Sequence, residues 1–206
     1  MVRTAVFVSG GGSNLQSLID AFSSGHITGG EICLVFSNKQ GAYGLERAAK
    51  AGIKTVCLLP KDFESREAFD LETANVMNAE GINLICLAGY MRVLSKVFID
   101  TYKGKIMNIH PALLPDFGGE GMYGIHVHEA VLKAGVKETG CTVHFVDYGT
   151  DTGPVILQRR APVQAGDTPE ILQKRVLSEE HKAYPEAVKL FCEGRIKTDG
   201  GSVTIK

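Results

Sequence analysis

The stretch "TAVFVSGGGSNLQSL", residues 4–18, decides the fold of the amino-terminal half. An apolar run at 4–9 leads into three consecutive glycines, and a helical pattern begins at residue 14. This order predicts a β-strand, a tight glycine loop and the start of a helix. Glycines let backbone N–H groups approach a ligand closely, and a helix N-terminus favours an anion. The stretch therefore predicts one strand–loop–helix unit of an α/β fold, with an anion site in its loop.

The glycine loop does not match the common nucleotide-binding patterns. Gly10 and Gly12 fit the dinucleotide pattern GxGxxG, but Leu15 occupies the third glycine position. The second predicted strand ends in Ser37-Asn38, with no acidic residue to hold an adenine ribose. The pattern typical of nucleoside triphosphatases also fails, because no lysine follows the glycines. The loop is better suited to a single phosphate monoester, and a plain tight turn is the alternative.

Short apolar runs alternate with helical patterns along the first half of the chain. The runs predict strands at 31–38, 54–60, 82–89 and 105–110. The helical patterns lie at 14–25, 43–52 and 65–81. Strands with little polar alternation are typical of a parallel sheet that helices cover on both faces. The predicted fold is therefore α/β, with a Rossmann-like, mostly parallel sheet flanked by helices.

The second half of the chain has a different pattern. Three elements are predicted from it: antiparallel strands at 140–149 and 153–163, and a hairpin at 195–206 that turns at Asp199-Gly200. One long helix lies between them. Asp167 or Thr168 can cap it, and Pro169 suits its first turn. We see no repeat or linker, so residues 1–206 are predicted to form one domain.

Composition limits the classes of function. The chain has 206 residues and a net charge of −1, which gives no reason to expect a nucleic-acid or membrane partner. No run of 18 apolar residues is present, and the first residues suit a strand better than a signal peptide. Cys33, Cys57 and Cys86 each lie in an apolar run, which predicts buried, reduced thiols in a cytoplasmic protein. A catalytic thiol would need an exposed, electropositive setting.

The stretch "MNIHPALLP", residues 107–115, carries the candidate chemistry. Asn108 and His110 project to one face at the end of a strand, and Pro111 ends that strand. Open α/β sheets bind ligands at this edge. An amide and an imidazole side by side can stabilise an oxyanion and move a proton. Asp151, in the loop "DYGTDTGP", is expected to raise the pKa of His110 and to orient it. Simple capping of the strand end is the alternative.

The other histidines indicate less. His126 and His128 could form a metal pair, but no second ligand cluster accompanies them, so no metal is predicted. His144 is expected to be a hydrogen-bonded strand histidine near the site. No GxSxG motif appears, so acyl-enzyme chemistry of that kind is unsupported.

Seven motifs together carry a resemblance to a known family. They are "FVSGGGSNLQ", "FSNKQGAYGLERA", "SREAFD", "LAGYMRVLS", "NIHPALLP", "TVHFVDYGTDTGPVILQ" and "SEEHKAYP". In this order, from about residue 4 to about residue 195, the chain resembles the phosphoribosylglycinamide formyltransferases, folate-dependent enzymes of purine biosynthesis. The "NIHP" motif with a later DxGP is shared by the wider family of 10-formyltetrahydrofolate users. The glycine loop and the chain length favour this branch.

The resemblance implies formyl transfer from 10-formyltetrahydrofolate, as co-substrate, to the glycinamide amine, without metal. It implies Asn108, His110 and Asp151 as catalytic residues, with His110 as general acid and Asp151 as its partner. The implied phosphate site is Gly12, Ser13 and Asn14, and the implied ribose and glycinamide site is Leu177, Ser178, Glu179 and Glu180. The implied folate pocket is Arg66, Met91, Arg92, Val93, Leu94, Asn108, Asp147, Tyr148, Gly149, Thr150 and Asp151. Residues 1–100 would then be the phosphate and substrate half, and 101–206 the catalytic and folate half.

One segment departs from the family pattern. The stretch "DFGGEGMYGIHVH", residues 116–128, is long and rich in glycine. A mobile lid and a tolerated surface insertion are both open interpretations of it. A 10-formyltetrahydrofolate hydrolase that uses the same Asn, His and Asp is the alternative function. The expected partners are small molecules, with no nucleic acid or membrane, and the protein is expected to be a monomer or a homodimer in the cytoplasm.

Overall fold

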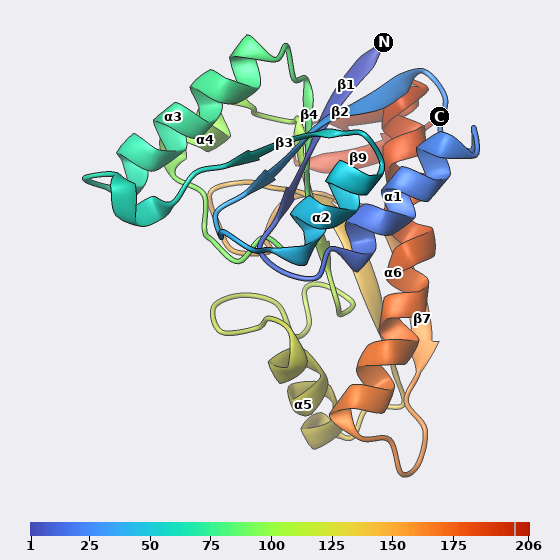
Figure 1. The fold of residues 1–206 in the computed structure, drawn as a ribbon. Coiled ribbons are helices and arrows are strands. Elements are labelled where there is room, and N and C mark those ends of the chain that lie inside the picture. Colours follow the sequence, from blue (N-terminus) through green and yellow to red (C-terminus); the bar gives the residue numbers. More distant parts are fainter. Residues whose placement is uncertain (200) are drawn as a thin grey trace. The chain divides into compact units, whose positions relative to one another are not determined.

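The computed structural model describes residues 1–199 and 201–206, which fall into two compact units, Met1–Met107 and Asn108–Lys206. The first unit contains β1 (Val2–Val8), α1 (Ser13–Ser23), β2 (Gly30–Ser37), α2 (Tyr43–Lys50), β3 (Lys54–Cys57), a 3-10 turn η1 (Pro60–Asp62), α3 (Arg66–Ala79), β4 (Leu84–Leu87) and α4 (Lys96–Thr101). The strand β5 (Ile106–His110) carries the chain into the second unit. That unit continues with α5 (Ile125–Ala134), β6 (Glu138–Phe145), β7 (Val155–Pro162), α6 (Pro169–Cys192), β8 (Ile196–Asp199) and β9 (Ser202–Ile205) (Figure 1).

Seven strands hydrogen-bond in the order β3-β2-β1-β4-β5-β6-β7, and β8 and β9 form a separate pair. The pairs β1–β2, β1–β4 and β2–β3 are parallel, whereas β6–β7 and β8–β9 are antiparallel. This arrangement confirms the predicted α/β class, with a mostly parallel sheet and antiparallel strands in the carboxyl-terminal part. The prediction of one domain, with a substrate half at 1–100 and a catalytic half at 101–206, stays a prediction.

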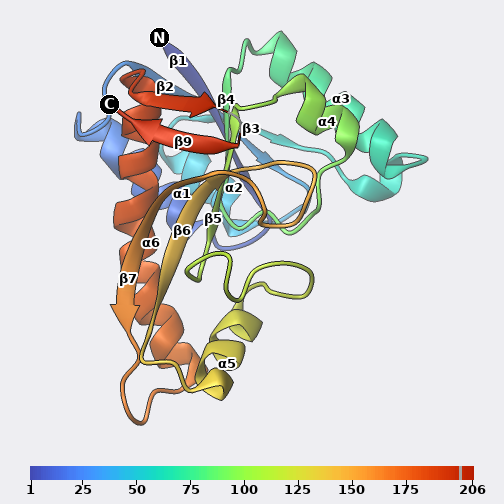
Figure 2. The same ribbon diagram turned by 180° about the vertical axis from the view of Figure 1, so that it is seen from behind.

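The central strand of the first unit is buried on both faces. Phe7 of β1 packs against Phe36 of β2 and Phe98 of α4, with ring centroids 4.7 and 5.9 Å apart. The next residue, Val8, points the other way and lies against Gly44 of α2. Alternate residues of one strand therefore meet helices on opposite sides, which is the reason that apolar runs without polar alternation predicted this sheet. Figures 1 and 2 show the helices of this unit on its two sides.

The prediction of buried thiols is wrong for part of the set. Cys86 is buried, but Cys33 is half-buried and Cys57 is exposed, and all three are free. Cys57 lies on β3, a four-residue strand at one edge of the sheet, which within residues 1–199 and 201–206 pairs with β2 alone. An edge strand with one neighbour leaves part of its side chains in solvent even when its sequence is apolar.

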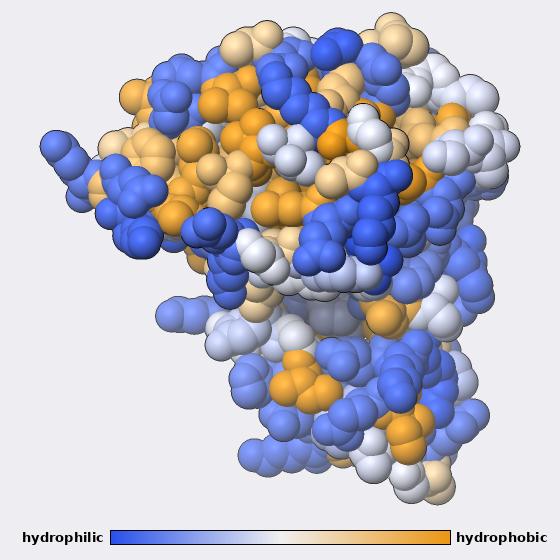
Figure 3. Space-filling model, in the orientation of Figure 1, coloured by the Kyte–Doolittle hydropathy of each residue, from blue (hydrophilic) through white to orange (hydrophobic). Residues whose placement is uncertain are grey.

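Figure 3 shows a broad apolar area over the part of the first unit where β3 and α3 lie.

The second unit forms around an antiparallel pair and a long helix. α6 packs against both β6 and β7 (Figure 2). Thr168 is its N-cap and accepts a hydrogen bond from Ile171 N, whereas Asp167 binds Arg175 instead. The predicted tail hairpin is confirmed by the pairing of β8 with β9, and Gly200 of its predicted turn lies outside the described residues. Within those residues, no helix is long and apolar enough to cross a membrane.

Candidate active site

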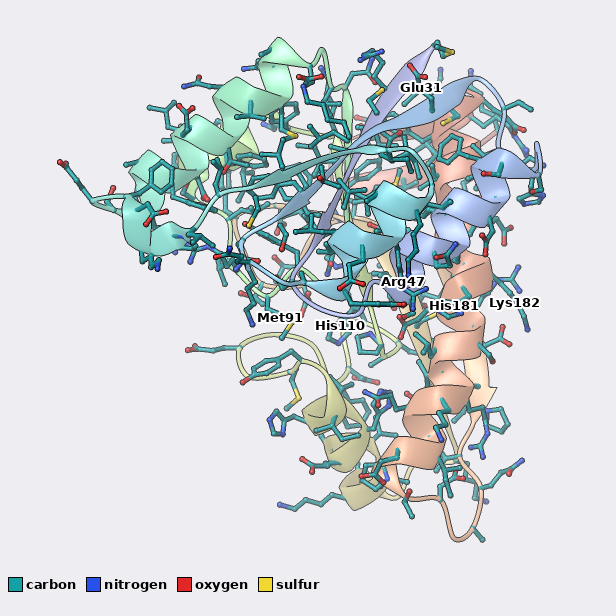
Figure 4. All side chains as sticks on the ribbon, in the orientation of Figure 1. Glu31, Arg47, Met91, His110, His181 and Lys182 are labelled. Carbon is teal, nitrogen blue, oxygen red and sulfur yellow. The ribbon has the colours of Figure 1, made fainter. Side chains whose placement is uncertain are left out.

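Side chains from β5, β6 and the loop after β6 meet in the second unit. His110, the last residue of β5, is 3% exposed, and its Nδ1 lies 3.4 Å from Oδ2 of Asp151. Asp151 Oδ1 lies 3.6 Å from Nε2 of His144 on β6. The amide Nδ2 of Asn108 lies 3.2 Å from the same Nε2. The structure therefore brings together the three residues that the sequence selected and adds His144 as a direct member of the cluster. Figure 4 labels His110.

Two backbone carbonyls fix the tautomers of the histidines, because a carbonyl oxygen only accepts. His110 Nε2 donates to Phe117 O at 2.8 Å, and His144 Nδ1 donates to Phe145 O at 2.9 Å. In neutral His144 the other nitrogen, Nε2, must then be an acceptor, so Asn108 Nδ2 donates to it. The Asn108 amide is thereby held with one N–H committed and the other N–H left to donate elsewhere. Sequence reasoning assigned His144 to the neighbourhood but missed this orienting contact.

Burial and charge act in opposite directions on the two central groups. Burial lowers the pKa of His110, and this effect outweighs the Asp151 carboxylate, which raises it. Asp151 therefore raises the pKa of His110 as expected, but the net pKa lies below its usual value, because the imidazole is almost fully removed from water. Burial raises the pKa of Asp151, but the adjacent imidazoles of His144 and His110 and the hydrogen bond from Gly119 N together lower it below its usual value. The site accordingly favours an ionised Asp151 and a neutral His110.

The loop that carries Asp151 has a constrained backbone. Asp151 itself has φ 60°, a left-handed conformation that is uncommon for residues other than glycine. Its Oδ2 accepts a hydrogen bond of 3.1 Å from Gly119 N. A Cβ atom at Gly153 would overlap the carbonyl oxygen of Phe145. The glycine of the "DTGP" motif is thus required for the loop to return close to β6, and this return brings the carboxylate to His110.

The segment after His110 is held by one buried hydroxyl. Thr142 Oγ1 on β6 donates to Ala112 O at 2.7 Å and accepts from Leu114 N at 3.0 Å. Gln158 Nε2 donates to the same oxygen at 2.9 Å and to Leu114 O at 2.9 Å. These bonds satisfy the backbone of a chain that has left the sheet at Pro111. No sequence signal marked Thr142, because its role depends on the pairing of β6 with its neighbours.

The glycine-rich segment 116–124 borders this cluster through two backbone groups. Phe117 O accepts from His110, and Gly119 N donates to Asp151. Phe117 has φ 54°. The following helix, α5, carries His126, which pairs with Glu129 at 3.0 Å, and His128, which is buried. In residues 1–199 and 201–206 no group of three His, Cys, Asp or Glu side chains could hold a metal ion.

The glycine loop lies in the first unit and is built from backbone atoms. Gly12 has φ 69° and is the N-cap of α1, which has no side-chain cap. A Cβ atom at Gly12 would come within 2.8 Å of Gly44 Cα in α2, whereas Gly10 and Gly11 have open space around them. Gly44 N donates to Gly10 O at 3.0 Å. Arg47 Nε donates to Gly11 O at 2.8 Å, as Arg47 extends from α2 in Figure 4. Sequence reasoning missed Arg47.

The predicted folate residues of the first unit follow β4. Met91 and Val93 are 47% and 60% exposed, whereas Leu94 is buried. The Arg92 guanidinium lies 4.7 Å from the centroid of the Phe69 ring. The segment therefore presents two apolar side chains to solvent, and its arginine is occupied within the unit. Arg66, at the start of α3, is half exposed and lies 3.4 Å from Glu67.

The remaining predicted residues belong to the second unit. Asp147 Oδ1 accepts from Gly149 N at 3.1 Å and from Thr152 Oγ1 at 2.6 Å, which closes the loop around exposed Tyr148 and Thr150. On α6, Glu180 is 7% exposed, and Glu179 lies 2.6 Å from Lys182. Leu177 is half-buried, and Ser178 is exposed. The assignment of these residues to ligands stays a prediction.

Comparisons with known proteins show the family and the fold to which this chain is similar. The formyl transferase family model matches residues 2–188. A phosphoribosylglycinamide formyltransferase of Escherichia coli is 45% identical over 196 residues, which cover 95% of this chain and 90% of that protein. A trifunctional purine biosynthetic protein of Drosophila pseudoobscura is 47% identical over 196 residues, but the chain spans only 14% of its length. A glycinamide ribonucleotide transformylase structure from Symbiobacterium toebii has a TM-score of 0.94 and 45% identity, covering 100% of this chain and 94% of that one.

Proposed function

The chain belongs to the formyl transferase family, and from this premise we propose that it transfers the formyl group of 10-formyltetrahydrofolate to the amine of phosphoribosylglycinamide. The products would be formylglycinamide ribonucleotide and tetrahydrofolate. The observation that carries the proposal is the buried contact of His110 with Asp151, 3.4 Å apart, beside the oriented amide of Asn108. These groups suit a reaction that passes through an oxyanion and moves one proton.

In the proposed reaction the amine nitrogen attacks the formyl carbon, and the formyl oxygen becomes an oxyanion. The new C–N bond forms, and then the bond to N10 of the folate breaks. The attacking nitrogen loses one proton and N10 gains one, so no net proton is consumed. Asn108 has a second N–H to give to the oxyanion, because its first is committed to His144. The His110 Nε2–H, which here donates to Phe117 O, is the second proposed donor.

The ionisation states support this division of roles. Ionised Asp151 faces Nδ1 of His110 and favours the protonated imidazole that would form as the proton moves. Burial opposes that charged form, so it would be transient. We therefore propose His110 as the proton carrier and general acid, and Asp151 as the group that makes its protonation possible. No step requires a covalent intermediate with the protein.

We further propose that the phosphate of the amine substrate binds Gly12, Ser13 and Asn14. The open space at Gly10 and Gly11 and the start of α1, which has no side-chain cap, support this assignment, because a helix N-terminus favours an anion. Residues Leu177 to Glu180 would contact the ribose and glycinamide. The folate would contact Arg66, Met91 to Leu94, Asn108 and Asp147 to Asp151. Exposed Met91 and Val93 offer apolar area to a pterin ring.

The proposed location is the cytoplasm, and the proposed partners are these small molecules alone. A hydrolase with the same catalytic residues would release formate to water. The E. coli relative, which matches along 90% of its own length, carries the name of the transferase and supports that reaction for this chain.

The first experiment separates the transferase from the hydrolase. Purified protein with 10-formyltetrahydrofolate alone should release tetrahydrofolate very slowly, with no added metal. Phosphoribosylglycinamide should accelerate the release steeply and give formylated product in equal amount, because the phosphate and ribose align the amine. Fast formate release that the amine does not change would overturn the proposal and favour the hydrolase.

A second experiment tests the phosphate site through Gly11→Ala. The new methyl group meets no atom of the protein within 4 Å, so the loop can keep its conformation. A bound phosphate would meet that methyl group, so the KM for phosphoribosylglycinamide should rise at least tenfold more than the KM for the folate. Gly25→Ala, in equally open space away from the loop but at a positive φ of 73°, is the control. Equal changes in both KM values would contradict the assignment.

A further inference from the structure

One buried residue in the first unit, Ser9, precedes the glycine loop and bonds the segment that the proposed function assigns to the folate. Ser9 follows β1 directly and is 6% exposed. Its Oγ accepts a hydrogen bond of 2.8 Å from Met91 N and donates one of 2.6 Å to Asn38 Oδ1. Its backbone N donates to Gly89 O at 3.1 Å. Ser9 is thus bonded to the segment after β4 at two points.

These bonds join loops that are distant in sequence. Ser9 is the residue before the glycine loop, Asn38 is the residue after β2, and Met91 begins the segment 91–94. Because β2, β1 and β4 are neighbouring parallel strands, their carboxyl ends lie at one edge of the sheet. The Ser9 hydroxyl is therefore shared by three consecutive loops of that edge. Asn38 is 7% exposed, so its acceptor oxygen is also removed from water.

Each of the two substrate segments also has hydrogen bonds that do not involve Ser9. The glycine loop is held to α2 by the bonds from Gly44 N to Gly10 O and from Arg47 to Gly11 O. The segment 91–94 is held at its far end by Asp70, which is 1% exposed and accepts from Ser95 N at 2.5 Å. These outer attachments are independent of the hydroxyl. Loss of the hydroxyl would therefore leave both segments attached and remove the side-chain bond between Ser9 and Met91 N, while the bond from Ser9 N to Gly89 O remains.

We propose that Ser9, held by Asn38, is a positioning residue that couples the two substrate sites, so that a ligand on the glycine loop tightens the binding of folate at 91–94. This inference rests on the proposed function. A phosphate on the loop would restrict the backbone at residues 10–12, and through Ser9 it would restrict Met91 N as well. The second ligand then meets a segment that is already ordered and loses less conformational entropy on binding. The hydroxyl acts through the loops and does not itself contact the reacting atoms.

Binding of tetrahydrofolate, which carries no formyl group and therefore cannot react, measures the coupling directly. We would determine the Kd of tetrahydrofolate by calorimetry, with and without saturating phosphoribosylglycinamide. In the unmodified protein the amine should tighten tetrahydrofolate binding about fivefold or more, within the range usual for coupled sites. In Ser9→Ala the ratio of the two Kd values should fall close to one, while each ligand still binds. Kinetically, both KM values should rise with little change in kcat.

Two further variants separate positioning from general damage. Ser9→Thr keeps the hydroxyl and should keep the coupling, whereas Asn38→Ala removes the acceptor and should reduce it. Ser24→Ala is the matched control, because its hydroxyl bonds only the Ala21 carbonyl at 3.2 Å on α1. If Ser9→Ala does not fold, Asn38→Ala carries the same test from the other end of the bond.

The unmodified protein tests the coupling, and the variants test the role of the hydroxyl. A ratio near one in the unmodified protein overturns the coupling even when both ligands bind and turnover is normal. A ratio that Ser9→Ala and Asn38→Ala leave unchanged overturns the role of the hydroxyl. Failure of the unmodified protein to bind either ligand would instead count against the proposed function, so the two failures are distinguishable.

Discussion

The glycine loop and the cluster around His110 are built from different parts of the polypeptide. At residues 10–12 the groups available to a ligand are backbone atoms, and the bonds that hold them run to α2 within the same unit. Around His110 the grouped polar atoms belong to side chains of residues 108, 110, 144 and 151, and burial lowers the pKa of His110. The conformation of the glycine loop depends on the absence of a side chain at Gly12, where a Cβ atom would overlap α2. The orientation of the side chains around His110 depends on their hydrogen-bond partners. Each site should therefore be sensitive to a different kind of substitution.

The largest expected effect is on the side-chain cluster. His110→Ala removes a proposed oxyanion donor and the proton carrier, and kcat should fall about 10²–10⁴-fold, the usual range for general acid–base help. The fold should persist, as judged by circular dichroism. His26→Ala, an exposed histidine of the first unit, should leave kcat unchanged. A fall of less than tenfold in His110→Ala would remove this residue from the chemistry.

The next effect concerns the support of the cluster. Thr142→Val removes the donor to Ala112 O and the acceptor for Leu114 N, and it should cost about 1–3 kcal/mol in the free energy of unfolding because buried polar groups lose their partners. Thr139→Val is a matched control on the same strand. Thr139 is 1% exposed, and its Oγ1 has no hydrogen-bond partner among residues 1–199 and 201–206, so its loss should be neutral or stabilising. Urea denaturation of both variants measures the difference, and equal losses would contradict the hydrogen-bond account.

The glycine loop should respond to backbone conformation instead. Gly12→Ala forces an L-residue to φ 69° and brings a Cβ atom within 2.8 Å of Gly44 Cα, so it should destabilise the protein by about 1–2 kcal/mol. Gly11→Ala should change stability little, since Gly11 has open space and no positive φ. Thermal and urea unfolding of the two variants compare them. Equal stability would mean that α2 moves away from the loop at no cost.

The smallest effect is a change in proton affinity. Asp151→Asn removes the carboxylate that raises the pKa of His110, so burial should lower that pKa further. Titration of the His110 ring by NMR should show the decrease in Asp151→Asn. Asp116→Asn, which changes an exposed carboxylate six residues after His110 in the sequence, should leave the His110 pKa unchanged. Because unfolded histidine titrates near pH 6.5 and folded His110 binds its proton less readily, stability should fall as pH drops below about 6.5. The fall should be larger in Asp151→Asn, and an unchanged His110 pKa would mean that the two groups are not coupled.

Much of the fold could be predicted because its strands are buried on both faces. Apolar runs such as residues 4–8 and 84–87 carry that signal locally, and the pairing of β1 with β2 and β4 confirms it. α4 (Lys96–Thr101) was missed, since six residues are too few for a clear period. Cys57 was assigned to the core because its neighbours are apolar, and only the sheet order reveals that β3 is an edge strand.

For the site, the sequence by itself predicted Asn108, His110 and Asp151 as catalytic candidates and determined that Asn108 and His110 share a face. It also determined where glycines allow close approach, because these properties belong to short stretches of chain. Tertiary structure alone decided that His144 orients Asn108, that Thr142 holds the segment after His110, and that Arg47 binds the glycine loop. It also decided the sign of the His110 pKa shift, because desolvation depends on everything packed around the imidazole, whereas the attraction of Asp151 could be anticipated from one pair.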